Sequence, residues 1–190
     1  IDFFDFFHKK KILNFLKKND YTNFDVFFDV GAHKGETIEL FIKNFNISKI
    51  YSFEASPINY EFLKKKFIKL QNKKIFLENI AIGSKSGRAQ LKQVQESSSS
   101  TLSNINLESK YFKKKKKILN FFSNQKEYFH NIEVEMTTLN EYLKLNAIKN
   151  INFLKIDTEG YEFEVLLGLK EKIKDVEIVL FEHHFDDMLI

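Results

Sequence analysis

The chain has 190 residues, enough for one domain with a complete hydrophobic core. It contains no Cys, which excludes disulfide bonds, thiolate nucleophiles and zinc–thiolate sites. The formal net charge of +4 is mildly basic and does not by itself indicate a nucleic-acid partner, so none is expected.

Residues 1–24 predict a helical cover at the start of the domain. Ile1 to Asn19 reads IDFFDFFHKKKILNFLKKN, a helix with aromatic residues on one side. We expect it to cover the sheet or the mouth of the binding site, and a helix lying on a membrane surface is the less favoured alternative. Its apolar runs are too short and too interrupted by charge for a transmembrane span, and no signal-peptide layout is present. The expected location is cytoplasmic, with peripheral membrane contact as an open alternative.

The stretch Asp25 to Thr37, DVFFDVGAHKGET, predicts a strand, a glycine loop and a helix start. Asp25 to Val30 is apolar, β-branched and aromatic, the pattern of a strand buried on both faces of a parallel sheet. The strand breaks at Gly31, Gly35 follows, and Thr37 to Phe45 continues as an amphipathic helix.

The chemistry of this loop indicates a ligand with both a cationic and an anionic group. Gly31 has no β-carbon, so the backbone can turn sharply and a ligand can approach closely. The helix start exposes N–H groups that favour an anion, and Asp29 can accept hydrogen bonds from a cationic or hydroxyl group. The Walker pattern and the full G-x-G-x-x-G dinucleotide fingerprint are both absent from the sequence. An acid followed by a G-x-x-x-G loop suits an amino-acid-like ligand, such as the methionine end of S-adenosylmethionine.

The next predicted strand, Lys49 to Glu54, also ends in an acid. An acid at this position typically binds the ribose hydroxyls of an adenosine. NAD enzymes share it, so Glu54 alone does not separate the cofactors, although the incomplete fingerprint disfavours a nicotinamide oxidoreductase. Ser56-Pro57 is expected to start a helix from Ile58 to Leu70, because Pro suits a first helical turn. A third strand is expected from Lys74 to Ile82, with Asn79 near its carboxyl end.

A further strand is predicted from Arg88 to Val94, and a Lys-rich helical insertion at residues 110–131. A basic amphipathic helix is most often a solvated face, and the alternative is contact with an anionic membrane or a lipid-linked acceptor. The lysines that would make this contact are Lys113, Lys114, Lys115, Lys116 and Lys117.

The last third of the chain predicts two more strands with polar ends. Its expected elements are a short strand (Ile132 to Met136), a helix capped by Thr138 (Leu139 to Leu145), a fourth strand (Asn152 to Asp157), the turn Thr158-Glu159-Gly160 with a following helix, and a fifth strand (Val176 to Phe181). Glu182, His183 and His184 come next. Because the chain does not begin with Met and ends soon after the fifth strand, we expect a fragment truncated at the C-terminus.

Alternating strands and helices predict an α/β fold with a doubly wound, mostly parallel sheet, in a single domain over residues 1–190. In such sheets ligands bind outside the carboxyl ends of the strands, where the strand order reverses. The polar strand ends expected to meet at this edge are Asp29, Glu54, Asn79, Asp157 and Glu182.

A series of motifs runs in order from about Asp25 to His184: DVGAHKGET, SFEASPINYEFLKKKF, NIAIGSKSG, SSSSTLSNIN, MTTLNEYL, LKIDTEGYEFEVLLG and IVLFEHH. In this order they resemble the FkbM-type family of S-adenosylmethionine-dependent methyltransferases, with IDTEGYE as the most specific element. The resemblance implies a Rossmann-like class I methyltransferase fold and O-methyl transfer to a hydroxyl of a sugar, a glycan or a similar metabolite. It also implies that Asn79 lines an adenine pocket and that serines of Ser97 to Thr101 contact the acceptor. With the loop and strand ends above, the expected cofactor-binding residues are Asp29, Gly31, Ala32, His33, Gly35, Glu54, Ala55, Asn79, Ala81, Asp157 and Glu159.

The expected catalytic residues are Asp157, Glu182 and His183. Three roles compete: Asp157 holds the methionine ammonium, Asp157 and Glu182 bind a divalent metal, or His183 takes the acceptor proton. We favour catalysis without a metal, in which Asp157 and Glu159 position the cofactor or acceptor and His183 is the base. The alternative function is a catalytically inactive cofactor-binding or scaffolding protein with the same fold.

Overall fold

The computed structural model describes residues 2–68, 74–94, 100–104, 106, 108, 109, 113 and 129–181. Its centre is a five-stranded sheet in the order β3-β2-β1-β7-β8, and all neighbouring strands are parallel. The strands are β1 (Asn23–Val30), β2 (Asn46–Phe53), β3 (Lys74–Glu78), β7 (Ile151–Ile156) and β8 (Val176–Phe181). The chain winds outward from β1 to β3 on one side and from β7 to β8 on the other. This is the predicted doubly wound sheet, and its switch point lies between β1 and β7.

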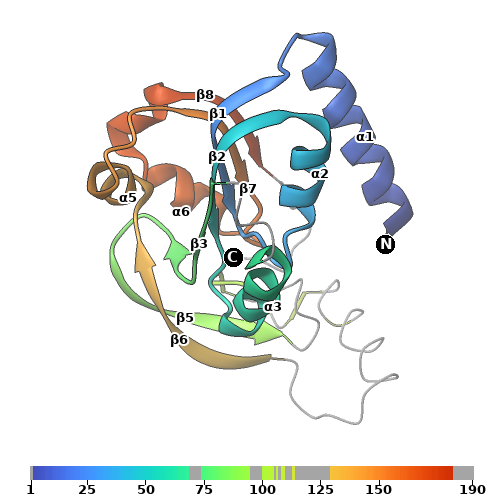
Figure 1. Cartoon of the computed structure of the whole chain (residues 1–190). Coiled ribbons are helices and arrows are strands. Elements are labelled where there is room, and N and C mark those ends of the chain that lie inside the picture. The colour runs from blue at the N-terminus through green and yellow to red at the C-terminus, as the bar shows by residue number, and fades with distance from the viewer. Residues whose placement is uncertain are drawn as a thin grey trace.

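Helices cover both faces of the sheet (Figure 1). The helices α1 (Asp2–Lys18), α2 (Glu36–Asn44) and α3 (Pro57–Phe67) contribute side chains to one core cluster, and α5 (Leu139–Leu145) and α6 (Glu162–Leu167) contribute to the other. A 3-10 helix, η3 (Lys170–Asp175), leads into β8. No helix within the described ranges is long and apolar enough to cross a membrane.

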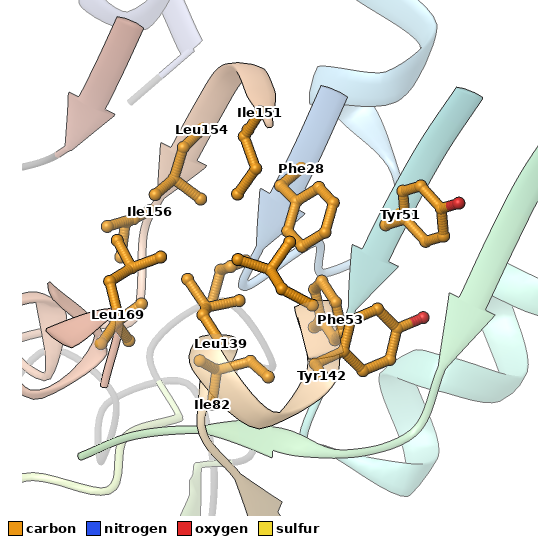
Figure 2. Packing of buried hydrophobic residues seen from close by; sticks show 13 residues of the cluster. Phe28, Tyr51, Phe53, Ile82, Leu139, Tyr142, Ile151, Leu154, Ile156 and Leu169 are labelled. Carbon is orange, nitrogen blue, oxygen red and sulfur yellow. The ribbon is translucent and has the colours of Figure 1, made fainter. Parts of the chain in front are cut away.

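Two consecutive phenylalanines of β1 pack on opposite faces of the main sheet. Successive strand side chains point to opposite faces, so Phe27 and Phe28 enter different cores. Phe27 stacks on Phe41 of α2, with ring centroids 4.8 Å apart. Phe28 packs in the cluster of Figure 2, where Tyr142 of α5 meets Phe53 edge-on at 4.8 Å. Both faces of the strand are therefore buried, as the sequence pattern predicted.

The predicted third strand is wrong as one element, because Lys74 to Ile82 divides between two sheets. Its first part is β3 of the main sheet, and Ala81–Ile82 forms β4 of a three-stranded sheet in the order β4-β6-β5. Ala81 pairs with Met136 of β6, so the chain leaves the main sheet at Asn79. The other strands of this small sheet are β5 (Gly87–Val94) and β6 (Phe129–Thr137).

Two helix starts follow the sequence prediction. Ser56 accepts a hydrogen bond from the Asn59 N–H, and Pro57 occupies the first turn of α3. Thr138 accepts a hydrogen bond from the Glu141 N–H and caps α5. β6 begins at Phe129, earlier than predicted, because it pairs antiparallel with the whole of β5.

Candidate active site

The structure brings four of the five predicted polar strand ends to one edge of the main sheet. Asp29 lies near the end of β1, Glu54 and Asn79 directly follow β2 and β3, and Asp157 follows β7. Glu182 and His183, predicted as catalytic residues after β8, lie outside the described residues, as does His184. These carboxyl ends of the strands flank the switch point between β1 and β7, where doubly wound folds bind ligands.

Gly31 packs directly against the end of β7. Its φ of +75° is in the left-handed region, and a β-carbon there would overlap the carbonyl oxygen of Asp157. The Asp157 N–H in turn donates to the carbonyl of Val30 at 3.0 Å. The glycine loop and the turn after β7 therefore form one continuous surface.

The N–H groups of the glycine loop are committed to the protein. Those of Gly31 and Ala32 both donate to the carbonyl of Phe53 at 3.0 Å, and that of Gly35 donates to Ala32 at 2.8 Å. The N–H groups of the two intervening residues bind carboxylates: His33 donates to Glu54 at 2.7 Å, and Lys34 donates to Glu36 at 3.2 Å. All backbone N–H groups from residue 31 to residue 35 therefore donate within the protein.

Glu54 fastens the glycine loop to the start of α3. One carboxylate oxygen accepts the His33 N–H at 2.7 Å, and the other accepts the Ser56 N–H at 2.8 Å. The side chain is 7% exposed, and burial raises its pKa although the two N–H donors oppose the shift. Each oxygen retains a further lone pair, so the expected contact with ribose hydroxyls is compatible with this geometry.

Lys155 is the residue of this edge that sequence reasoning missed. It stands beside Asp29 on the neighbouring strand, and its Nζ lies 3.1 Å from the Asp29 carboxylate. The same ammonium lies 3.4 Å from Asp157 Oδ2 and donates to the Gly31 carbonyl at 2.7 Å. The one available signal was a lysine inside the apolar run NFLKID.

These charges stabilise one another. Burial alone would lower the pKa of Lys155, but the carboxylates of Asp29 and Asp157 raise it, so the ammonium stays charged. Asp29 is completely buried, and burial raises its pKa against the opposing charge of Lys155. Asp29 was expected to meet a cationic group of the ligand, and in the structure a cation of the chain itself fills that place.

The turn after β7 is organised by Glu162, also absent from the predicted site. Its Oε1 accepts the N–H groups of Thr158 at 2.9 Å and of Gly160 at 3.1 Å. Glu159 and Gly160 both have positive φ, +54° and +91°. Positive φ costs energy at a non-glycine residue, and such strain is found disproportionately at functional sites.

The serine-rich segment contacts this turn. The Thr101 hydroxyl donates to the carbonyl of Glu159 at 2.6 Å, and the Ser103 hydroxyl donates to that of Gly160 at 2.8 Å. Lys92 of β5 holds the segment through a hydrogen bond to the Ser103 carbonyl at 2.9 Å. We call residues 100–104 the strap. Of the serines predicted as acceptor contacts, Ser97 to Ser99 lie outside the described residues, and the Ser100 hydroxyl accepts a hydrogen bond from the side-chain amide of Gln93 at 2.8 Å.

Among the remaining predicted cofactor-binding residues, Asn79, Ala55 and His33 lie in segments that follow strands of the main sheet. Ala81 does not, because it belongs to β4 of the small sheet. Asn79 donates from its side-chain amide to the Glu54 carbonyl at 2.8 Å, so it bridges the ends of β2 and β3. Ala81 is buried in the core of the small sheet, and Ala55 packs partly against that core. His33 has a φ of +50° and its Nδ1 lies 3.3 Å from Glu36.

Within the parts of the chain that the structure describes, no three His, Asp or Glu side chains are grouped so that they could hold a metal ion. The predicted pair for a divalent cation, Asp157 with Glu182, includes a residue outside those parts.

A family model described as "Methyltransferase FkbM domain" matches residues 29–189. The chain belongs to the FkbM methyltransferase family. No curated protein matches the sequence.

One solved structure shares the fold of this FkbM domain. It is a methyltransferase FkbM from Methylobacillus flagellatus KT, with a TM-score of 0.50 and 15% sequence identity. The match covers 80% of the present chain but 30% of that protein's chain. At this identity the likeness establishes the Rossmann-like α/β fold.

Proposed function

We propose that the chain is an S-adenosylmethionine-dependent O-methyltransferase that acts on a hydroxyl of a sugar, a glycan or a similar metabolite. The observation that carries the cofactor assignment is the pair of carboxylates at the carboxyl ends of the strands, near the switch point. There Asp157 and Glu54 flank a glycine loop whose N–H groups donate within the protein. S-adenosylmethionine carries two cationic groups, a sulfonium and an ammonium, and an adenosine with free ribose hydroxyls. A carboxylate-rich edge fits these groups.

Different residues at this edge would bind different parts of the cofactor. Glu54 and Asn79 follow β2 and β3, on the side where an adenosine would lie, with Glu54 beside the ribose hydroxyls. Asp157 and Glu159 follow β7, beside Gly31, and would face the amino-acid end or the acceptor. The Asp157 side chain is 38% exposed and hence reachable from solvent.

Methyl transfer to oxygen is an in-line displacement. When bound, S-adenosylmethionine supplies a methyl group on a sulfonium; the acceptor oxygen bonds to that carbon while the carbon–sulfur bond breaks. The protein's contribution is to align the acceptor oxygen with the methyl carbon and to take the hydroxyl proton. On the basis of the sequence, we assign to His183 the role of the base that takes the hydroxyl proton, because imidazole titrates near neutral pH.

Contact with an anionic membrane or a lipid-linked acceptor through residues 113–117 is a further part of this proposal. Lys113 is the described member of this run, and its Nζ lies 2.6 Å from Glu108. Replacing these five lysines with Gln would lower binding to anionic liposomes in a salt-dependent way.

Isothermal titration with S-adenosylhomocysteine tests the cofactor assignment. We expect saturable binding that NADH does not displace, and absence of binding would contradict the proposal. The acceptor is then sought by mass spectrometry of glycans from a strain that lacks the gene, where a loss of methyl mass is expected. Cofactor binding without transfer to any acceptor would support the catalytically inactive alternative.

A further inference from the structure

Lys155 and Asp29 form an ion pair in the interior of the sheet. Lys155 is 6% exposed and Asp29 is fully buried, with the two charged groups 3.1 Å apart. Removing two charges from water costs about as much as their attraction returns, so such a pair seldom stabilises a fold more than an apolar pair would. Stability alone does not account for charges at these two positions.

The other contacts of Lys155 reach the ligand-binding edge. Its ammonium donates to the carbonyl of Gly31 at 2.7 Å and lies 3.4 Å from Asp157 Oδ2. Gly31 is the first residue of the glycine loop, and Asp157 follows the end of β7. One buried cation therefore joins the loop, the end of β7 and the interior of the sheet.

The hydrogen bonds of the loop indicate which part of the cofactor meets Asp157. The N–H groups from residue 31 to residue 35 all donate within the protein, so they do not offer a site for the cofactor's carboxylate. Beside Gly31 the partly exposed group is the Asp157 carboxylate. This arrangement favours recognition of the ammonium at the amino-acid end.

We propose that Lys155 is a positioning residue that holds the Gly31 carbonyl and the Asp157 carboxylate together, so that Asp157 receives the ammonium of S-adenosylmethionine. The inference rests on the proposed function and adds to it how the amino-acid end is recognised. Lys155 does not touch the cofactor in this arrangement, because it lies beneath the loop and acts through Asp157.

The test is the double variant Asp29→Asn/Lys155→Met, which removes one negative and one positive charge and leaves no buried charge without its partner. Its affinity is measured by isothermal titration for S-adenosylhomocysteine and for 5′-methylthioadenosine, which lacks the amino and carboxyl groups. We expect affinity for S-adenosylhomocysteine to fall by about tenfold or more, and affinity for 5′-methylthioadenosine to change by less than about twofold. If the double variant does not fold, Lys155→Arg, which keeps the charge but moves the donors, is expected to show the same selective loss.

The matched control is Asp175→Asn/Lys172→Met, which removes an ion pair of 2.7 Å from η3, before the start of β8. It should leave both affinities unchanged. Equal losses for the two ligands in the Lys155 variant would mean a merely structural role, and an unchanged affinity for S-adenosylhomocysteine would mean no role in recognition; either result overturns the inference. Failure of the unmodified protein to bind S-adenosylhomocysteine would instead overturn the proposed function, on which the inference depends.

Discussion

At the scale of single residues, Glu54 connects the glycine loop and the start of α3 through its two backbone hydrogen bonds. Glu54→Gln replaces one accepting oxygen with an NH2 group, which cannot accept from His33 or Ser56. We expect a loss of about 1–3 kcal/mol in the free energy of unfolding, because a buried N–H is left unpaired, together with weaker binding of S-adenosylhomocysteine. Urea denaturation and isothermal titration measure the two effects.

The control is Glu61→Gln on the exposed side of α3, where the carboxylate lies 3.9 Å from Lys64. An exposed pair of this kind contributes little, so stability should hardly change. Equal stability and affinity for Glu54→Gln and the unmodified protein would show that the hydrogen bond lost in the variant is not needed.

The glycine loop lowers the pKa of the Glu36 carboxyl through His33. Burial opposes its charge, but hydrogen bonds from His33 and from its own N–H, with the charges of His33 and Lys66, lower its pKa from the ordinary 4.5 to about 2. Since the folded-state value is depressed, Glu36 contributes stability that is complete above about pH 4.5 and is lost as the pH falls toward 2.

An NMR titration of the Glu36 side-chain carbon is expected to show a midpoint far below 4.5, and in His33→Ala the midpoint should rise toward 4.5. A Glu36 midpoint that does not move in His33→Ala would mean that the histidine is not the source of the shift.

At the scale of elements, the strap connects the small sheet to the turn after β7. Thr101 and Ser103 are 1% and 6% exposed, and their hydroxyls donate to the carbonyls of Glu159 and Gly160. Thr101→Val keeps the shape of the side chain but removes its hydroxyl donor. Ser103→Ala removes the hydroxyl donor of Ser103 and leaves a smaller side chain. Each should cost about 1–2 kcal/mol and speed amide hydrogen exchange in the turn, from residue 158 to residue 162.

Thr22→Val is the control, because the Thr22 hydroxyl makes an exposed contact with Asn23 away from the turn. Exchange in the turn that is as slow in Thr101→Val as in Thr22→Val would show that the strap does not hold it.

The division of Lys74 to Ile82 between two sheets shows what a sequence pattern does not reveal about a strand. Lys74 to Ile82 has apolar residues on both sides of Glu78 and Asn79, but a pattern does not say with which neighbour each apolar part pairs. Pairing with β6 takes Ala81–Ile82 into another sheet. By contrast, the caps of α3 and α5 were predictable because the hydrogen bonds that define them lie within one turn of sequence.

For the whole molecule, strand–helix alternation predicted the doubly wound sheet, and the motif order predicted the FkbM family. The strand ends Asp29, Glu54 and Asp157 were found because parallel strands bring their carboxyl ends to one edge. Lys155 and Ser103 were missed because their partners are distant in sequence and depend on strand register and on the docking of the strap.

The last prediction concerns metal dependence of the whole protein. A ligand present at a hundred times its Kd stabilises the folded state by about 2.7 kcal/mol, which for a domain of this size raises Tm by about 5–10 °C. If catalysis and cofactor binding need no metal, S-adenosylhomocysteine should raise Tm equally in EDTA and in added Mg²⁺ or Mn²⁺. His183→Ala should show the same rise, because a base that acts on the acceptor proton does not contribute to cofactor binding. A rise that disappears in EDTA and returns with Mn²⁺ would show that cofactor binding itself needs a divalent cation, for which Asp157 and Glu182 are the ligands predicted from the sequence.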